Sequence, residues 1–136
     1  MNDLFEKIIR GELPSEKVYE DERTVAFLDI NPTNPGHTLV VPRHYSKNIH
    51  DIPEEDWVAV MKTARLLAPA IQKAVGADGV NVIMNNESAA GQLVFHSHVH
   101  IVPRFKDDGF RHWKGSPYKD GEMSKIGEKI RKSLSQ

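Results

Sequence analysis

The sequence contains no cysteine, which excludes disulfide scaffolds, thiol catalysis and metal sites built from thiolates. Any metal would therefore need histidine and carboxylate ligands. Uninterrupted apolar runs of roughly 18–20 residues, the length of a membrane-spanning helix, are also lacking, so we expect no membrane partner. The first residues are acidic and do not resemble a signal peptide, and we therefore expect a cytoplasmic protein.

An excess of charge of one sign is lacking too. The 18 Lys and Arg residues balance 19 Asp and Glu residues, so no overall basic field would attract the chain to nucleic acid. A small-molecule substrate is the better expectation. The hydrophobic share of 39% and the charged share of 27% are typical of a folded chain, and the length suits one domain over 1–136.

The hydrophobic periodicity predicts an α+β fold with about five antiparallel strands. Strands are expected at 17–20, 24–29, 37–42, 79–85 and 94–102. A short N-terminal helix should begin with a capping box at Asp3 and end at Gly11. One long helix is expected over 53–75, packed against the sheet, with a kink or local break at Pro69. A polar tail from about 107 should include a weak helix near its end.

A cluster of histidines is the most informative local pattern. His96, His98 and His100 lie in a predicted strand, where alternate side chains point to one face, so the three rings should project together. The opposite, mainly apolar face should pack against a helix. A solvated histidine strip without function is the plain alternative, but few such explanations suit so tight a pattern.

Metal binding and covalent catalysis are the two kinds of chemistry to consider for these rings. Residues two apart in a strand are about 6.7 Å apart, whereas zinc requires nitrogens at roughly 2.0–2.1 Å, so three rings in line suit an ion poorly. Two neighbouring histidines of the three could still bind one metal ion together. The favoured hypothesis is covalent catalysis, in which His98 attacks phosphorus and the flanking rings donate hydrogen bonds or a proton. Repulsion between imidazolium ions should help to keep His98 unprotonated near neutral pH.

The segment 96–102 resembles the motif of the histidine triad (HIT) family, in which histidines alternate with apolar residues. The resemblance extends from about Leu4 to Arg104, and within the family it looks most like the nucleoside phosphoramidase branch. Four further blocks support it, at 4–14, 26–32, 36–42 and 91–96.

The resemblance implies a role for each residue of a nucleotide site. His98 is expected to attack the α-phosphate of a purine nucleotide, His100 to contact the phosphate, and His96 and His37 to complete the proton and hydrogen-bond network. Asp29 is expected to bind the ribose hydroxyls. The base is expected among Phe5, Ile8, Leu13, Phe27 and Ile30, and the phosphate against Asn85, Gly91 and Gln92. Singly, the apolar residues would more often be core and Asp29 a turn former.

The sequence also departs from the family pattern. Ser97 stands where an apolar residue is preferred, and Leu93 stands where the phosphoramidase branch often has a serine near the leaving group. Some members bind structural zinc through two cysteines near the N-terminus. Asp3 and Glu6 occupy those positions here, so we expect no metal, and no cofactor is implied. His44 and His50 would then be ordinary surface histidines.

The expected reaction is nucleotidyl transfer to His98 followed by hydrolysis, with release of a nucleoside monophosphate and an amine. Hydrolysis of dinucleoside polyphosphates uses the same chemistry with another leaving group and stays open. A nucleotide-binding regulatory module with incidental catalysis is the alternative from another class. The resemblance further implies a homodimer with joined five-stranded sheets. The tail around Trp113 either covers a site or supplies a packing residue.

Overall fold

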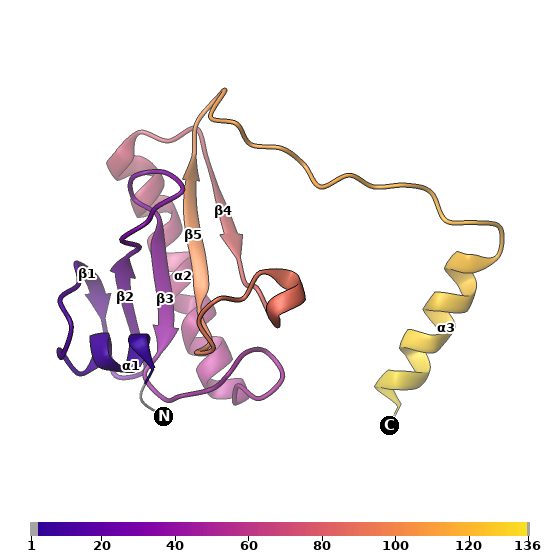
Figure 1. Cartoon of the computed structure of the whole chain (residues 1–136), viewed down its shortest axis with the longest axis horizontal. Coiled ribbons are helices and arrows are strands. Elements are labelled where there is room, and N and C mark those ends of the chain that lie inside the picture. Colours follow the sequence, from indigo (N-terminus) through magenta and orange to yellow (C-terminus); the bar gives the residue numbers. More distant parts are fainter. Residues whose placement is uncertain (1–2, 136) are drawn as a thin grey trace.

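The computed structural model describes residues 3–135 and has one five-stranded sheet with strand order β1-β2-β3-β5-β4 (Figure 1). All neighbouring strands are antiparallel. The strands are β1 (Lys17–Glu20), β2 (Thr24–Leu28), β3 (Thr38–Pro42), β4 (Gly79–Ile83) and β5 (Val99–Arg104). The helices are α1 (Leu4–Ile9), α2 (Glu54–Val75), α3 (Glu122–Leu134) and the short 3-10 helix η1 (Ser88–Ala90). The predicted α+β class, with one long helix and a short N-terminal helix, is confirmed.

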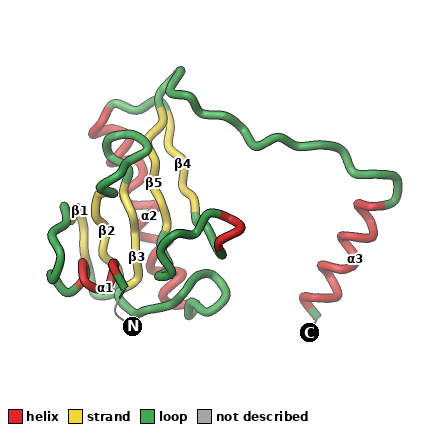
Figure 2. The backbone as a smooth tube through the Cα atoms, in the orientation of Figure 1, coloured by secondary structure: helices red, strands yellow, loops and turns green. Residues whose placement is uncertain are grey.

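Helix α2 covers one face of the sheet (Figures 1 and 2). The core on that side joins strand and helix residues: Ala26, Val40, Val99, Ile101, Val60, Ala64, Leu67 and Ala68. A second core lies on the other face and includes α1: Phe5, Ile8, Val25, Phe27, Leu39 and Val41. Because side chains alternate along a strand, burying Val99 and Ile101 toward α2 turns His100 to the α1 face.

Helices α1 and α2 begin and end close to the positions that the sequence predicts, although α1 stops at Ile9 and α2 starts at Glu54. The Asp3 carboxylate caps α1, accepting a hydrogen bond from the Glu6 backbone N–H at 2.8 Å. Pro53 precedes α2, and Gly76 ends it with φ 67°, a left-handed conformation that glycine adopts without steric cost. The helix is continuous through Pro69 to Val75, so of the kink or local break expected there the break does not occur.

The largest error in the predicted strands lies at the histidine motif. The strand expected from residue 94 begins at Val99, so His96 and His98 lie outside the sheet ladder. The backbone of this segment bonds to a loop instead of a strand, since the Ser97 N–H donates to the Ser46 carbonyl at 2.8 Å. Smaller differences are that β2 ends at Leu28, β3 begins at Thr38 and β4 ends at Ile83.

Beyond β5 the chain runs as an extended segment to α3, which lies apart from the sheet (Figure 1). The expected weak C-terminal helix is therefore present as α3, with 13 residues. Its apolar side chains are exposed: Met123 65%, Ile126 37%, Ile130 56% and Leu134 81%. Trp113 in the extended segment is 94% exposed and so is not a packing residue of this chain. None of the helices in the described residues is both long and apolar enough to traverse a bilayer.

Candidate active site

Three strand ends bring the candidate residues together on the α1 face. Asp29 follows β2, His37 precedes β3, and His100 lies in β5 opposite Leu39. A backbone hydrogen bond of 2.9 Å from the Asp29 N–H to the His37 carbonyl closes the β2–β3 turn. Antiparallel pairing therefore places residues from distant parts of the sequence in one cluster.

His98 has a defined hydrogen on one ring nitrogen. Its Nδ1 lies 2.7 Å from the backbone carbonyl oxygen of His96. A carbonyl oxygen only accepts, so Nδ1 carries the hydrogen and donates it. In the neutral ring the lone pair is then on Nε2, the nitrogen for which residues 3–135 supply no hydrogen-bond partner. This is the state that a nucleophilic imidazole requires.

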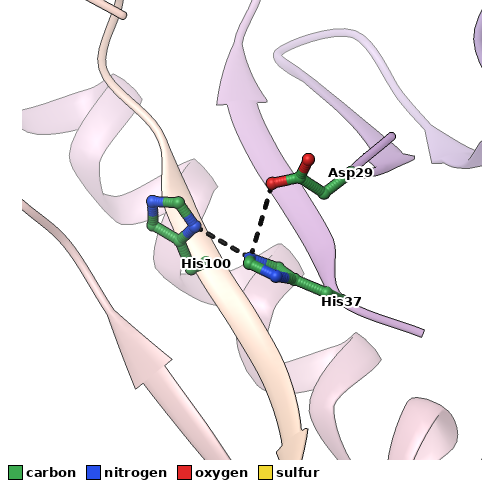
Figure 3. Close-up of side chains that lie close together, drawn as sticks. All are labelled: Asp29, His37 and His100. Atoms are coloured by element: carbon green, nitrogen blue, oxygen red, sulfur yellow. Dashed lines mark hydrogen bonds and ion pairs between the residues drawn. The ribbon is translucent and has the colours of Figure 1, made fainter. Parts of the chain in front are cut away.

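His37 and His100 form a directed pair (Figure 3). The Thr33 backbone N–H lies 3.1 Å from His37 Nδ1, which must accept. Neutral His37 therefore carries its hydrogen on Nε2, and it donates this hydrogen to His100 Nδ1 at 2.9 Å. Neutral His100 in turn carries its hydrogen on Nε2. The hydrogen bonds from Thr33 to His37 and from His37 to His100 therefore leave the Nε2–H of His100 able to donate to an oxygen.

Asp29 adds a carboxylate to this pair. Its Oδ2 lies 3.7 Å from His37 Nε2, and its Oδ1 accepts a hydrogen bond from the Asn31 N–H at 2.9 Å. The side chain is 22% exposed. Asp29 is therefore both the turn former that composition alone suggests and an accessible carboxylate beside the histidines.

Asp29, His37 and His100 each offer one ligand atom within 4.8 Å of the others, the spacing of a potential metal site (Figure 3). Two of these atoms, His37 Nε2 and His100 Nδ1, already form a hydrogen bond with each other. A shared proton therefore accounts for their approach. The zinc hypothesis drawn from the sequence concerned neighbouring histidines of the triad, and this cluster is a different set.

Burial favours the neutral form of all three histidines. It lowers the pKa of His100 to about 4, with further lowering by neighbouring His98 and His37. The pKa of His98 is lowered chiefly by burial, which outweighs its hydrogen bond to the His96 carbonyl. Burial also lowers the pKa of His37, against the attraction of Asp29. Mutual repulsion, expected from the sequence, contributes to His98 and His100, but desolvation is the larger cause.

His96 has a different position from its two neighbours. It is 0% exposed, with Nδ1 3.1 Å from Asp3 Oδ2 and Nε2 3.0 Å from the Pro42 carbonyl oxygen. Both nitrogens are occupied by protein acceptors. The expectation from the sequence that both flanking rings donate to a phosphoryl group is therefore wrong for His96, because the ring is buried and both of its nitrogens face acceptors of the protein.

The residues expected around a base divide into two groups. Phe5, Ile8 and Phe27 are buried in the second core cluster, and Leu13 packs against that cluster. Ile30 is 84% exposed beside Asp29. Phe5 also contacts His98 edge to face, with ring centroids 4.9 Å apart. Phe5 therefore both packs in the core and lies next to the histidines.

The residues expected against the phosphate lie in the loop between β4 and β5. Asn85 and Gly91 are neighbours, since a Cβ placed on Gly91 would lie 3.6 Å from Asn85 Nδ2. Gly91 has φ 93°, which favours glycine. Gln92 is 3% exposed, and its amide bonds to the carbonyls of Lys47 and Val94 and accepts from Asn48 and Glu87. The Gln92 side chain therefore shapes the loop.

Two of the sequence departures have clear structural outcomes. Ser97 is 0% exposed, and its hydroxyl pairs with the Ser46 hydroxyl at 2.7 Å, so the polar group behind the motif is satisfied. Leu93 is 89% exposed. The expected surface position of His44 and His50 is also seen, as both are exposed.

Sequence reasoning missed Thr33, Asn48 and the role of Asp3. Thr33 acts through its backbone N–H, which no side-chain pattern reveals. Asn48 is 0% exposed and holds Gln92 and Glu87, but an asparagine in a polar loop gives no signal of burial. Asp3 was identified as a helix cap, while its contact with His96 spans 93 positions.

Comparison with known proteins matches this arrangement to one family. A model described as the HIT domain matches residues 10–107. The adenosine 5'-monophosphoramidase of Saccharomyces cerevisiae is 39% identical over 131 residues, covering 96% of this chain and 79% of that protein. An adenylylsulfatase of Arabidopsis thaliana is 42% identical over 105 residues, which cover 77% of this chain and 53% of that protein.

A solved structure of a HIT family member from Bacillus subtilis superposes with a TM-score of 0.89 at 39% identity. The alignment covers 97% of this chain and 96% of that one. It therefore includes most of the extended segment and α3 as well as the sheet.

Proposed function

Because the chain belongs to the HIT family, we propose that it cleaves a bond to the α-phosphate of a purine nucleotide, with a nucleoside phosphoramidate as the substrate type. The coarse activity, nucleotide hydrolysis, agrees with relatives named as an adenosine 5'-monophosphoramidase and an adenylylsulfatase. The finer parts of the proposal rest on the geometry of the histidines.

One observation carries the proposal: the hydrogen bond of 2.7 Å between His98 Nδ1 and the His96 carbonyl. It leaves the lone pair on Nε2, and burial lowers the pKa of His98, so the ring is neutral at pH 7. In the first step Nε2 attacks the α-phosphorus, the bond from phosphorus to the leaving amine breaks, and the amine takes up a proton from solvent. Water then attacks the phosphorus and loses a proton to solvent, the bond to His98 breaks, and the nucleoside monophosphate is released with His98 neutral again.

The other residues have roles that follow from their donors and acceptors. His100 Nε2–H, oriented by His37, donates to a phosphoryl oxygen as negative charge develops there. Asp29 accepts from the ribose hydroxyls with its partly exposed carboxylate. Phe5 and Ile30 supply apolar surface for the base, and the loop containing Asn85 and Gly91 approaches the phosphate.

The leaving group is tested by comparing turnover of three substrates: an adenosine phosphoramidate, a diadenosine polyphosphate and adenylyl sulfate. We expect the phosphoramidate to be the best, and a His98→Ala variant to lose activity on all three. Higher turnover of the polyphosphate would make the enzyme a dinucleoside polyphosphate hydrolase. Tight AMP binding by calorimetry, with turnover that is negligible and unchanged in His98→Ala, would instead establish a nucleotide-binding module.

A homodimer is part of the same proposal. A helix of 13 residues is marginally stable in water on its own and gains most of its stability from packing. The apolar residues of α3 are exposed and contribute to neither core cluster of the described chain. The start of the segment leading to α3 is held by the Asp108 carboxylate, which accepts from Arg104 and Asn34. A second copy of the chain would cover the apolar face of α3.

A further inference from the structure

The surroundings of His96 determine its charge. Its two ring nitrogens face the Asp3 carboxylate and the Pro42 carbonyl. Both of these groups accept hydrogen bonds, so both nitrogens must donate, and an imidazole that donates twice is a protonated imidazolium. The ring also makes T-shaped contacts with Phe5 and Tyr45, with centroids 5.9 and 5.5 Å away. The Asp3 carboxylate, 3.1 Å from Nδ1, is the acidic group that pairs with His96 in the described residues.

Both oxygens of the Asp3 carboxylate have a partner. Its Oδ1 accepts the Glu6 N–H at 2.8 Å, and its Oδ2 faces His96. A carboxylate at a helix N-terminus is stabilised by the amides of the first turn and by the helix dipole. The side chain is only 14% exposed, so the pair is shielded from water, and a buried charge needs a partner of opposite sign.

Two paths lead from Asp3 to His98. The first runs through His96, whose own carbonyl oxygen accepts the Nδ1–H of His98. The second runs through α1, which Asp3 caps and which carries Phe5 against the His98 ring. Loss of the whole Asp3 side chain would therefore disturb both contacts that fix the orientation of His98, whereas loss of its charge alone would disturb the path through His96.

We propose that Asp3 is a positioning residue: its carboxylate holds His96 as a buried imidazolium, and this pair fixes the backbone carbonyl and the aromatic contact that orient His98. The inference rests on the proposed role of His98 as nucleophile. The charge on His96 has a second consequence, because it disfavours protonation of His98 and so lowers the pKa of that ring.

The test compares Asp3→Asn with the wild type in the full chain. Asparagine is also a good N-cap, so the α1 cap is retained, but its amide cannot take the negative charge or accept with both atoms. Histidine ¹⁵N NMR at pH 7 should show both His96 nitrogens protonated in the wild type and one deprotonated in Asp3→Asn. With the phosphoramidate, kcat should fall about tenfold or more, a barrier increase of at least about 1.4 kcal/mol, while KM changes less.

Asp21→Asn is the matched control. Asp21 also accepts backbone N–H groups, from Arg23 and Thr24 in the β1–β2 turn, but it does not touch the histidines. This control should lose stability and keep the protonation of His96 and the kcat of the wild type. In Asp3→Asn the acid limb of kcat/KM should also move to higher pH, because a neutral His96 no longer opposes protonation of His98.

A wild-type His96 with one unprotonated nitrogen would overturn the inference. So would an Asp3→Asn variant with unchanged His96 protonation, kcat and acid limb. If the wild type turns over no nucleotide, the proposed function fails. The NMR result then decides the positioning role, because Asp3→Asn should still disturb the Nδ1–H tautomer of His98.

Discussion

His37 Nε2 lies 2.9 Å from His100 Nδ1, and the pair links the turn before β3 to the start of the neighbouring strand β5. The Thr33 N–H fixes the direction of this bond, because it occupies the other nitrogen of His37. His100 therefore presents its N–H rather than its lone pair. His100 could not both accept from His37 through its lone pair and attack phosphorus with it, and this supports the proposal that His98 is the nucleophile.

Replacing His37 by Asn should remove the donor that sets the His100 tautomer. We expect kcat/KM to fall about 10- to 100-fold, the loss typical when the partner that orients a metal-ligating histidine through its second nitrogen is removed. His44→Asn is the control, since the His44 side chain is 88% exposed. Steady-state kinetics of both variants check the prediction. Equal activities of His37→Asn and wild type would show that the His37–His100 bond has no role in turnover.

The pH dependence of kcat/KM should reflect the burial of His98, the proposed nucleophile. Protonation of His98 removes its lone pair, and burial lowers the pKa of this ring below the ordinary value of 6.5. Activity should therefore persist below pH 6.5 and decline only as the pH falls through the lowered pKa. A buffer series that keeps the ionic strength constant measures the acid limb. An acid limb above pH 6.5 would contradict the environment that we describe for His98.

Ile101 tests the placement of the two sheet faces. It is 0% exposed and packs in the core beneath α2, directly after His100. Ile101→Ala should cost about 2–5 kcal/mol in the free energy of unfolding, because it leaves a cavity in a close-packed core. Val82→Ala, at a position that is 45% exposed, should cost less than about 0.5 kcal/mol. Urea denaturation measures both, and equal losses would contradict the assigned core.

The exposed apolar face of α3 predicts dimerisation. Light scattering should give about twice the 15.4 kDa mass of the chain. The double variant Ile126→Asp/Ile130→Asp should shift the protein to monomer, because charges on that face oppose its burial. Ser133→Asp adds charge to the same helix at an exposed polar position and should remain dimeric. A monomeric wild type at micromolar concentration would exclude the homodimer.

Local signals predicted much of this fold. Alternation and helical spacing identified the five strands and α2, while the cap at Asp3 and the stop at Gly76 marked helix ends. These features depend on neighbours a few residues apart. The start of β5 did not follow from them, because the Ser97 N–H bonds to Ser46, 51 positions away in the sequence, and not to a strand.

The sequence predicted which residues the candidate site contains better than it predicted how they are arranged. The HIT resemblance named His37 and Asp29, and the structure brings both beside His100. The burial of His96 could not be read from the motif, since its partners Asp3 and Pro42 lie 93 and 54 positions away. A strand model gives three equivalent rings, whereas in the fold His96 is fully buried between two acceptors, His98 donates to a backbone carbonyl and His100 pairs with His37.

Trapping the covalent intermediate tests the central claim most directly. The wild type is mixed with an adenosine phosphoramidate, quenched without acid, and analysed by intact and peptide mass spectrometry. We predict an acid-labile adduct of one adenylyl group on His98, absent from His98→Ala and retained by His96→Asn at a reduced level. Turnover with no adduct at any time point, or an adduct on another residue, would contradict the assignment of His98 as the nucleophile.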